Sequence, residues 1–477
     1  MTEVSLTQAA PTFEGDIDPA RVPERYRLGP AFVPKGRYLD VEFLELELEL
    51  LFPRTWLMAC RLEELPSIGS YVEYRIGDRS VLVVRESKDS IRAYHNACRH
   101  RGTRLATGRG RVGSIICPFH GWRWNLDGSI RLQLDPEEFV PRSDDDLGLQ
   151  PVRCEQWGGF VFINMDADAP PLLEYLDPIP ETLAPFQLDH MRIRWFKGTL
   201  VPCNWKTVLD GFLEGYHIPG THPQLNRPDR TNNNPATMKE IDGLRSWSPT
   251  SVYERHAMYQ SLGVKRRQSE RLDKDPARRP GAGGGEDPRE GIAGAVEYIY
   301  QELRALETER SVRAAQLLRE TELPEGKNAG LHHLELYRQL AIDEGLDWPE
   351  ITPAQWAAAG TAWHITPNTI VLPNQGAALV YRARPHGLDP DQCLFEIMCL
   401  EQIPVDRYDE KWEVTPEFHE DFRQGDLGQI LTQDLENTEN ITVGMHSPSF
   451  DGHRLSTEQE MTIYNHHRVA DRYLWDA

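Results

Sequence analysis

Cys98-Arg99-His100-Arg101-Gly102 and Cys117-Pro118-Phe119-His120-Gly121-Trp122 are the two stretches that decide the fold of the first part of this chain. Each offers one thiolate and one imidazole, and sixteen residues separate the two sets. Cysteine and histidine alternate, as C-x-H and then C-x2-H, whereas common zinc fingers pair like with like. Two thiolates on one iron and two imidazoles on the other hold a [2Fe–2S] cluster. We therefore predict such a cluster rather than a zinc site with unusual ligand order. The predicted ligands are Cys98, His100, Cys117 and His120.

Length and composition describe an ordinary globular protein. The 477 residues are 39% hydrophobic and 26% charged, enough for two or three domains. A formal net charge of −22 argues against nucleic-acid binding through a basic surface. The sequence contains no run of 18 apolar residues, so no membrane-spanning helix is expected. The polar segment 1–18 lacks the pattern of a signal peptide. Five of the seven cysteines stand singly outside the predicted cluster, which favours buried thiols in a cytoplasmic protein.

Short β-rich pieces surround the two cysteine–histidine loops. An amphipathic helix is predicted over residues 40–56, and strands follow at 71–75, 80–85, 91–95, 114–117, 123–125 and 157–163. We predict a small all-β domain over residues 40–165, in which the two loops are hairpin tips that project together.

The second half predicts an α+β domain with an antiparallel sheet and a long helix packed on it. Strands are predicted at 191–200, 369–372, 376–382 and 393–402, and helices at 293–318, 331–343 and 456–474. The polar stretch 226–290 predicts a loop.

Residues 204–222 (NWKTVLDGFLEGYHIPGTH) predict a second metal site. Three polar residues fall at i, i+4 and i+7 on one face of a predicted helix, namely Asp210, Glu214 and His217. Pro219 is expected to end this helix near His217. Gly220 then lets the chain turn, so that His222 returns beside His217.

A 2-His-1-carboxylate triad needs one more oxygen ligand and leaves positions open for O2 and iron(II) redox chemistry. Asp434, in the polar helix-like stretch 431–444, is the predicted ligand, with Glu436 and Asp426 as alternatives. The helix around Phe212 and Leu213 and two strand regions are expected to line an apolar cavity. The strand residues expected there are Trp363, Ile365, Ile370, Leu379, Phe395 and Met398.

Together these motifs resemble the α subunit of Rieske non-haem iron oxygenases, the aromatic-ring-hydroxylating group. The two cluster loops and the segment 204–222 carry most of the resemblance, which spans nearly the whole chain. It implies a Rieske domain, then a helix-grip catalytic domain over 166–477 with an insertion at about 226–345, and residues 1–39 as an arm of the catalytic domain. It also implies a homotrimer or an α3β3 assembly.

The resemblance assigns two further roles. An acidic residue three before the first iron histidine bridges the two centres across a subunit boundary in this family, and Glu214 holds that position. Asp210, four residues earlier, takes a position where family members carry a polar residue near the iron. Glutamate at the bridge is more usual in the branch that acts on quaternary amines.

Neither a dinucleotide fingerprint nor a flavin site is evident, so electrons are expected from NAD(P)H through a separate reductase, with or without a ferredoxin. We expect the terminal oxygenase of a multicomponent system that hydroxylates or dihydroxylates an aromatic or other hydrophobic ring in aromatic hydrocarbon catabolism. The alternative is a monooxygenase acting on a quaternary amine or N-methyl substrate. A protein that only transfers electrons is disfavoured, because it would not need the second metal site predicted at His217, His222 and Asp434.

Overall fold

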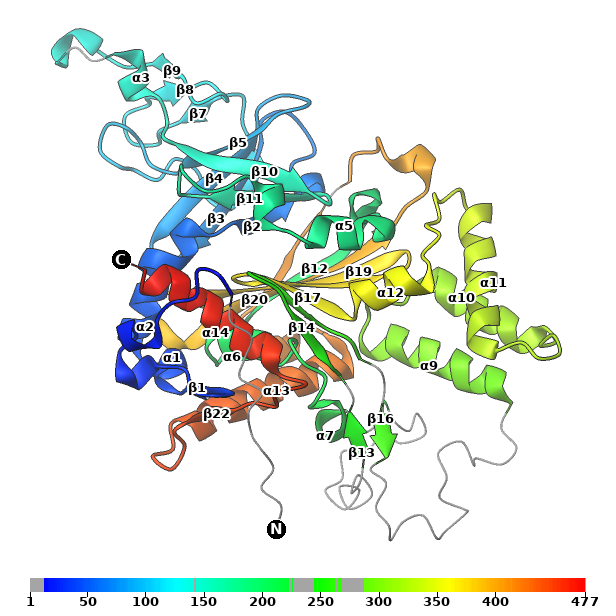
Figure 1. Cartoon of the computed structure of the whole chain (residues 1–477). Coiled ribbons are helices and arrows are strands. Elements are labelled where there is room, and N and C mark those ends of the chain that lie inside the picture. Colours follow the sequence, from blue (N-terminus) through cyan, green and yellow to red (C-terminus); the bar gives the residue numbers. More distant parts are fainter. Residues whose placement is uncertain are drawn as a thin grey trace.

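A β-rich domain precedes a larger α+β domain along the chain (Figure 1). The computed structural model describes residues 13–140, 143–222, 225, 244–246, 248–261, 264–266, 287–412 and 414–476. The β-rich domain contains a seven-stranded sheet in the order β2-β11-β10-β5-β4-β3-β6. Its strands are β2 (Leu57–Arg61), β3 (Ser70–Ile76), β4 (Arg79–Arg85), β5 (Ile91–His95), β6 (Arg109–Arg111), β10 (Pro151–Trp157) and β11 (Phe160–Asn164).

A second, three-stranded sheet of β7 (Ile115–Ile116), β8 (Arg123–Trp124) and β9 (Ile130–Leu132) carries the second cluster loop. This loop is a hairpin tip between β7 and β8, as predicted. The hairpin prediction is wrong for the first loop, because it joins β5 to β6, and β4 and β3 lie between those strands. The strand predicted over 157–163 is broken at Gly158 and Gly159, whose positive φ angles make the two-residue turn between β10 and β11.

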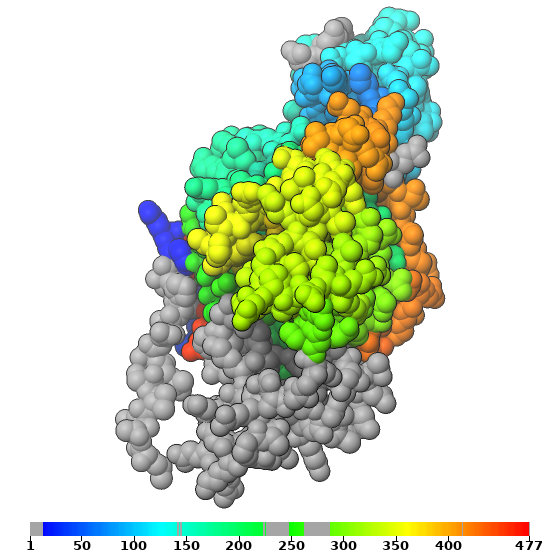
Figure 2. Space-filling view, turned by 90° about the vertical axis from the view of Figure 1, so that its right-hand side faces the viewer, coloured from blue at the N-terminus to red at the C-terminus, as the bar shows by residue number. Residues whose placement is uncertain are grey.

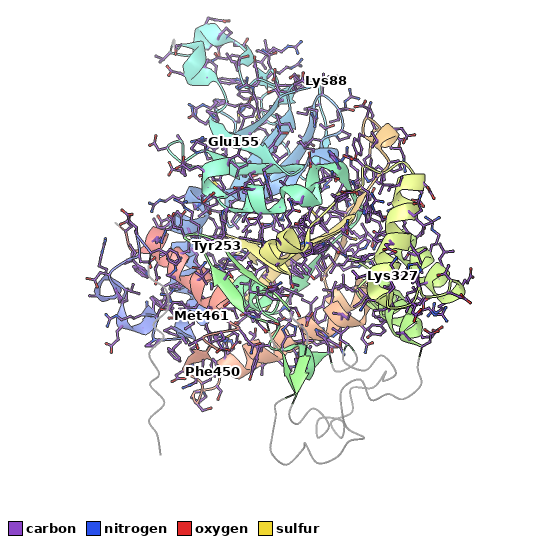
Figure 3. All side chains as sticks on the ribbon, turned by 45° about the vertical axis from the view of Figure 1, so that its right-hand side comes forward. Lys88, Glu155, Tyr253, Lys327, Phe450 and Met461 are labelled. Atoms are coloured by element: carbon purple, nitrogen blue, oxygen red, sulfur yellow. The ribbon has the colours of Figure 1, made fainter. Side chains whose placement is uncertain are left out.

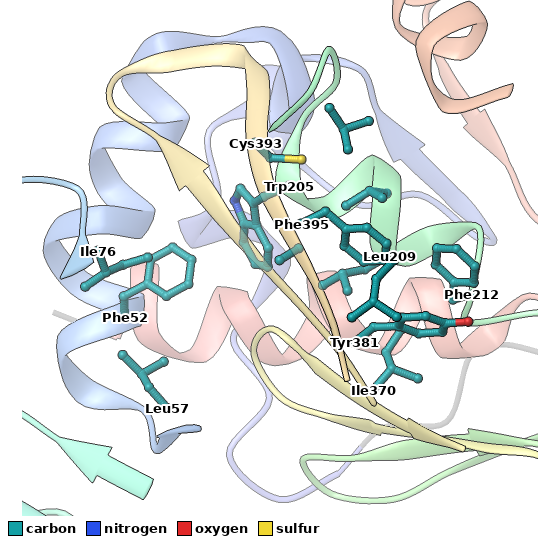
Figure 4. Packing of buried hydrophobic residues seen from close by; sticks show 14 of the residues in the cluster. Phe52, Leu57, Ile76, Trp205, Leu209, Phe212, Ile370, Tyr381, Cys393 and Phe395 are labelled. Carbon is teal, nitrogen blue, oxygen red and sulfur yellow. The ribbon is translucent and has the colours of Figure 1, made fainter. Parts of the chain in front are cut away.

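The helical segment before the first sheet touches both domains. It consists of α2 (Val41–Leu46), a π-helical turn (Glu47–Leu51) and a 3₁₀ turn (Phe52–Arg54), so the helix predicted over 40–56 is confirmed. The Leu48 side chain faces Gly77 in the β-rich domain. Phe52 and Ile76 lie near each other in the core (Figure 4), which also contains residues of the larger domain.

The larger domain is built on an eight-stranded sheet in the order β14-β15-β17-β18-β19-β20-β12-β21. All neighbours are antiparallel except β12 and β21. The strands predicted at 191–200, 369–372, 376–382 and 393–402 are confirmed. Strands β14, β15 and β21 were missed, and the first two lie in the polar stretch 226–290 that was predicted as a loop. The segments 226–243 and 267–286 of that stretch lie outside the described residues. The eight are β12 (Met191–Val201), β14 (Thr250–Val252), β15 (Ala257–Tyr259), β17 (Ala362–Ile365), β18 (Thr369–Asn374), β19 (Ala377–His386), β20 (Asp389–Gln402) and β21 (Glu417–His419).

The two faces of this sheet have different neighbours. One face packs against α6 (Trp205–Asp210), α13 (Gly428–Met445) and α14 (Met461–Leu474). The other packs against α5 (Ile179–Leu183) and α12 (Pro353–Ala359). Because side chains alternate along a strand, Ile370, Leu379 and Phe395 face α6, as expected of a cavity lining. Trp363, Ile365 and Met398 face the opposite side, so their predicted place in that lining is wrong.

Three helices, α9 (Pro288–Glu302), α10 (Glu309–Glu320) and α11 (Ala329–Asp343), form one face of the larger domain (Figure 2). Lys327, between α10 and α11, marks this region in Figure 3, while Lys88 and Glu155 mark the β-rich domain. The helix predicted over 331–343 is confirmed. The single helix predicted over 293–318 is wrong, because Arg304 and Leu306 have positive φ angles and Thr308 caps the start of α10.

The remaining short elements are β1 (Phe32–Pro34), α1 (Gly36–Leu39), α3 (Asp144–Leu147), α4 (Leu172–Tyr175), α7 (Ile218–Thr221), β13 (Leu244–Ser246), β16 (Val264–Arg266) and β22 (Gly452–Arg454). Strand β1 pairs with β22, which ties the N-terminal arm to the last part of the chain. In the part of the chain that the structure describes, no helix is both long and apolar enough to cross a membrane. The domain boundaries at residues 39 and 165 stay predictions.

Candidate metal centres

The two cluster loops share one turn geometry. The Gly102 N–H donates to the Cys98 carbonyl at 2.9 Å, and the Gly121 N–H donates to the Cys117 carbonyl at 3.0 Å. Both glycines have positive φ, 77° and 73°, a conformation that a side chain disfavours. The two loops therefore hold their cysteine and histidine with the same backbone turn.

All four predicted cluster ligands lie at one tip of the β-rich domain. The Cys98 and Cys117 thiols are buried, and the His100 and His120 ring centroids are 4.8 Å apart. The His100 ring also stacks on Trp122. Burial raises the pKa of the Cys117 thiol, but the backbone N–H groups of Phe119 and His120 outweigh burial and lower that pKa. Two buried thiols and two adjacent imidazoles fit a Rieske-type cluster.

The second site is built by a loop rather than by the predicted long helix. Helix α6 ends at Asp210, so the helix predicted to reach His217 is wrong, and no single helical face carries the three polar residues. Pro219 occupies the first turn of the short helix α7, where its missing N–H costs nothing, and it therefore opens a helix instead of ending one. His217 and His222 flank α7, which brings the two rings to a centroid distance of 5.4 Å.

Asp434 reaches this pair of histidines from α13. Its Oδ1 lies 2.8 Å from His222 Nε2 and 3.6 Å from His217 Nε2, and the three donor atoms lie within 4.8 Å of one another. Two imidazoles and one carboxylate fit a mononuclear iron site with open positions. The alternatives do not reach it: Glu436 is exposed, and Asp426 pairs with Arg304 at 2.5 Å. That these three side chains ligate iron stays a prediction.

Two further side chains fix the orientation of the histidines. The His217 Nδ1–H donates to Glu214 Oε1 at 2.7 Å, and the His222 Nδ1–H donates to Gln433 Oε1 at 3.0 Å. When the rings are neutral, these two acceptors favour the tautomer with the proton on Nδ1, so each Nε2 can bind a metal beside Asp434. Gln433 was not predicted, although its position beside Asp434 in the sequence was a usable signal.

Carboxylates dominate the electrostatics around His217. Burial lowers the pKa of His217, but Glu214, Asp434 and Glu460 outweigh burial and raise it to about 9. Glu460, which the sequence did not suggest, has a pKa raised to about 7, first by burial and then by Glu214. A cation at this site therefore meets several negative groups. The Tyr216 side chain, next to His217 in the sequence, is 55% exposed.

Glu214 and Asp210 have separate partners. Besides His217 Nδ1–H, the Glu214 carboxylate accepts the backbone N–H groups of Tyr216 and His217. Asp210, at the C-terminal end of α6, accepts a hydrogen bond from the Tyr38 hydroxyl on α1 at 2.6 Å.

Aromatic side chains pack beside the triad. Phe212 lies 4.3 Å from Tyr381 and 5.5 Å from Phe395, measured between ring centroids (Figure 4). Burial raises the pKa of Tyr259 and Tyr381, and the Asp434 carboxylate raises both further, so both hydroxyls lie within its field.

Comparison with known proteins agrees with this arrangement. A family model for the ring hydroxylating alpha subunit (catalytic domain) matches residues 180–475, more than half of the chain, and one for the Rieske [2Fe-2S] domain matches residues 55–140. The chain is 36% identical over 206 residues to the glycine betaine monooxygenase oxygenase subunit of Chromohalobacter salexigens, covering 42% of this chain and 45% of that protein. It is 32% identical over 208 residues to the carnitine monooxygenase oxygenase subunit of Escherichia coli K12, covering 42% and 56%.

These alignments span about half the length of the relatives. The solved structure of the quaternary ammonium Rieske monooxygenase CntA with L-carnitine shares the fold, with a TM-score of 0.58 and 18% identity over 95% of this chain and 99% of that one. The chain therefore belongs to the ring-hydroxylating α-subunit family of Rieske oxygenases and contains that family's Rieske [2Fe–2S] domain and catalytic non-haem iron domain.

Proposed function

We propose that this chain is the terminal oxygenase of a multicomponent system and oxidises an N-methyl group of a quaternary ammonium or related amine. This is the alternative that the sequence left open. The aromatic or hydrophobic ring substrate that the sequence favoured has less support, because relatives named for glycine betaine and carnitine are similar to this chain.

One observation carries the proposal: the predicted iron triad lies among carboxylates and aromatic rings. Glu214 and Glu460 act on His217, and the Tyr259 and Tyr381 hydroxyls lie within the field of Asp434. An onium group is stabilised by aromatic faces and by nearby negative charge. A neutral hydrocarbon gains nothing from these carboxylates.

His217, His222 and Asp434 would hold iron(II), which when bound supplies the redox chemistry that activates O2. Glu214 and Gln433 keep the Nδ1 protons in place, so that both Nε2 atoms stay available as ligands. We retain the proposal that Glu214 also accepts an N–H from a cluster histidine of a neighbouring subunit. A separate reductase, alone or with a ferredoxin, would supply the electrons.

Substrate-dependent O2 uptake with a surrogate reductase tests the function. The panel contains glycine betaine, carnitine and a tertiary N-methyl amine, together with naphthalene and biphenyl. Oxidation of an N-methyl group consumes one O2, two electrons and two protons, and releases formaldehyde and water. We expect formaldehyde in proportion to O2 with at least one ammonium compound. Coupled uptake with the hydrocarbons alone would contradict the proposal.

A further inference from the structure

The buried side chains of Tyr38 and His467 form a hydrogen-bonded cluster with Asp210, which is partly buried. The Tyr38 hydroxyl lies 2.6 Å from Asp210 Oδ2 and 2.8 Å from His467 Nε2. Tyr38 and His467 are 0% and 1% exposed. The three residues come from α1, the end of α6 and α14, so segments far apart in sequence meet here (Figure 1).

When Asp210 is ionised, the direction of both hydrogen bonds is fixed. A tyrosine hydroxyl has one hydrogen, so Tyr38 donates it to Asp210 and accepts from the His467 Nε2–H. Burial first, and then Arg37, lower the pKa of His467 well below its ordinary value, which keeps the ring neutral with one N–H. Both hydrogen bonds then stabilise the Asp210 carboxylate.

The second oxygen of Asp210 is the unusual feature. Asp210 Oδ1 is buried and has no hydrogen-bond partner among the described residues. A buried carboxylate oxygen without a donor is costly, and the cost falls when the group is protonated. Two effects on the protonation of Asp210 therefore oppose each other. The Tyr38 hydrogen bond favours the ionised carboxylate, and the unpartnered Oδ1 favours the protonated acid.

The neighbouring charged groups also act on the pKa of Asp210, which lies near neutral pH. Burial raises the pKa of Asp210, the Tyr38 hydrogen bond and the Lys206 ammonium lower it, and Glu460 and Glu214 raise it, with a result of about 7. The charged or titratable groups acting on His467 are Arg37, His466, Lys206 and His453.

We propose that Asp210 stores a proton for the oxygenation reaction and that Tyr38 and His467 are positioning residues that set its protonation state. The inference rests on the proposed function, since N-methyl oxidation consumes protons. When the proton is released, the Oδ1–H bond of Asp210 breaks, and the proton is one of the two that N-methyl oxidation consumes. Asp210 becomes a carboxylate held by the Tyr38 O–H, and no electron moves.

The first test is an infrared titration of the metal-free protein, which does not depend on activity. A carboxylic-acid carbonyl band that is absent from Asp210→Asn reports the protonated Asp210. We expect this band to titrate near neutral pH in the unaltered protein and at clearly higher pH in Tyr38→Phe, which loses the stabilising O–H but keeps its ring contacts with His453 and His467. Tyr175→Phe is the matched control, because it removes a buried hydroxyl that donates to Thr366 O instead.

The second test is the pH profile of turnover in the loaded enzyme. Activity should decline as pH rises through the pKa of Asp210, and in Tyr38→Phe this decline should move to higher pH by the same shift as the infrared band. Absence of an Asp210-dependent band near neutrality, or an unmoved band in Tyr38→Phe, would overturn the inference. If Tyr38→Phe does not fold, His467→Leu replaces it, since loss of the Nε2–H donor should also raise the pH at which the band titrates.

The two proposals fail separately. An enzyme without activity on any ammonium compound refutes the proposed function, while the infrared titration still decides whether Asp210 stores a proton. An active enzyme whose pH profile is unchanged in Tyr38→Phe refutes the inference alone.

Discussion

Among single residues, Glu214 is the one whose replacement should separate electron delivery from metal binding. In Glu214→Gln the amide oxygen can still accept the His217 Nδ1–H, but the NH2 group cannot accept a second N–H from a neighbouring subunit. We expect unchanged iron and sulfide contents and turnover reduced roughly 10- to 100-fold, the range for groups that support metal ligands. Metal analysis beside O2 uptake measures both. Glu436→Gln, on the exposed side of α13, is the control. Normal turnover with intact metals would refute the bridge.

Gln433 is a residue whose effect should fall on iron affinity. Gln433→Leu removes the oxygen that accepts the His222 Nδ1–H at 3.0 Å and leaves a buried N–H without that acceptor. Iron affinity should fall about 10- to 100-fold, as measured by competition with a chelator. Gln433→Glu keeps an acceptor oxygen at this position and should retain most of the affinity. Equal affinities in the leucine variant and the unaltered protein would show that the contact is unimportant.

At the scale of elements, the break between α9 and α10 depends on a cap. The Thr308 side chain accepts the Ser311 N–H at 3.1 Å, and the Ser311 hydroxyl accepts the Thr308 N–H at 2.9 Å. Thr308→Ala should lower the free energy of unfolding by about 1 kcal/mol, whereas Thr308→Ser should have little effect. Urea unfolding of the two variants measures the difference. Equal loss in both would indicate that the methyl group, not the hydroxyl, matters here.

The same elements show how far sequence could predict this fold. Strands such as β5 and β20 were predicted because alternation and β-branched residues are local signals. The cluster loops were predicted because ligand spacing is local too. The end of α6 at Asp210 was not predicted, because the loop 211–217 is held by the Glu214 carboxylate, which accepts the backbone N–H groups of Tyr216 and His217. Such contacts leave no periodic pattern in the sequence. Glu460 and Tyr38 were missed because only the fold brings them near His217 and Asp210, whereas Gln433 adjoins Asp434 in the sequence and was overlooked.

At the scale of the whole molecule, the two candidate centres lie far apart. The cluster loop between β7 and β8 lies at one end of the molecule, and α7 lies at the other (Figure 1). Electrons cross such distances slowly, so the iron site of one copy is expected to be served by the cluster of another. Co-expression of Cys117→Ser with His217→Ala should therefore give mixed assemblies with partial activity, although each variant alone is inactive. Mixed assemblies without activity would contradict transfer between subunits.

Buried neutral histidines should make the whole fold sensitive to acid. Burial lowers the pKa of His256 to about 3 and those of His364 and His453 to about 4. In the unfolded chain these groups titrate near 6.5, so the unfolded state binds protons first as pH falls. Their contribution is complete above about pH 6.5 and is lost as pH falls from there toward 4, by up to about 1.4 kcal/mol per pH unit for each histidine.

The hydrogen bonds of His256 explain why its buried ring resists protonation. Its Nδ1 accepts the Thr366 N–H at 3.2 Å and its Nε2–H donates to the Tyr175 carbonyl at 2.8 Å, so a second ring proton would face a donor. We expect the urea midpoint to fall clearly between about pH 7.5 and about pH 5.5. His364→Gln should make this slope shallower, because its amide can still donate to the Pro367 carbonyl but binds no proton in the unfolded chain. An equally steep pH dependence in His364→Gln and in the unaltered protein would contradict this account of the buried rings.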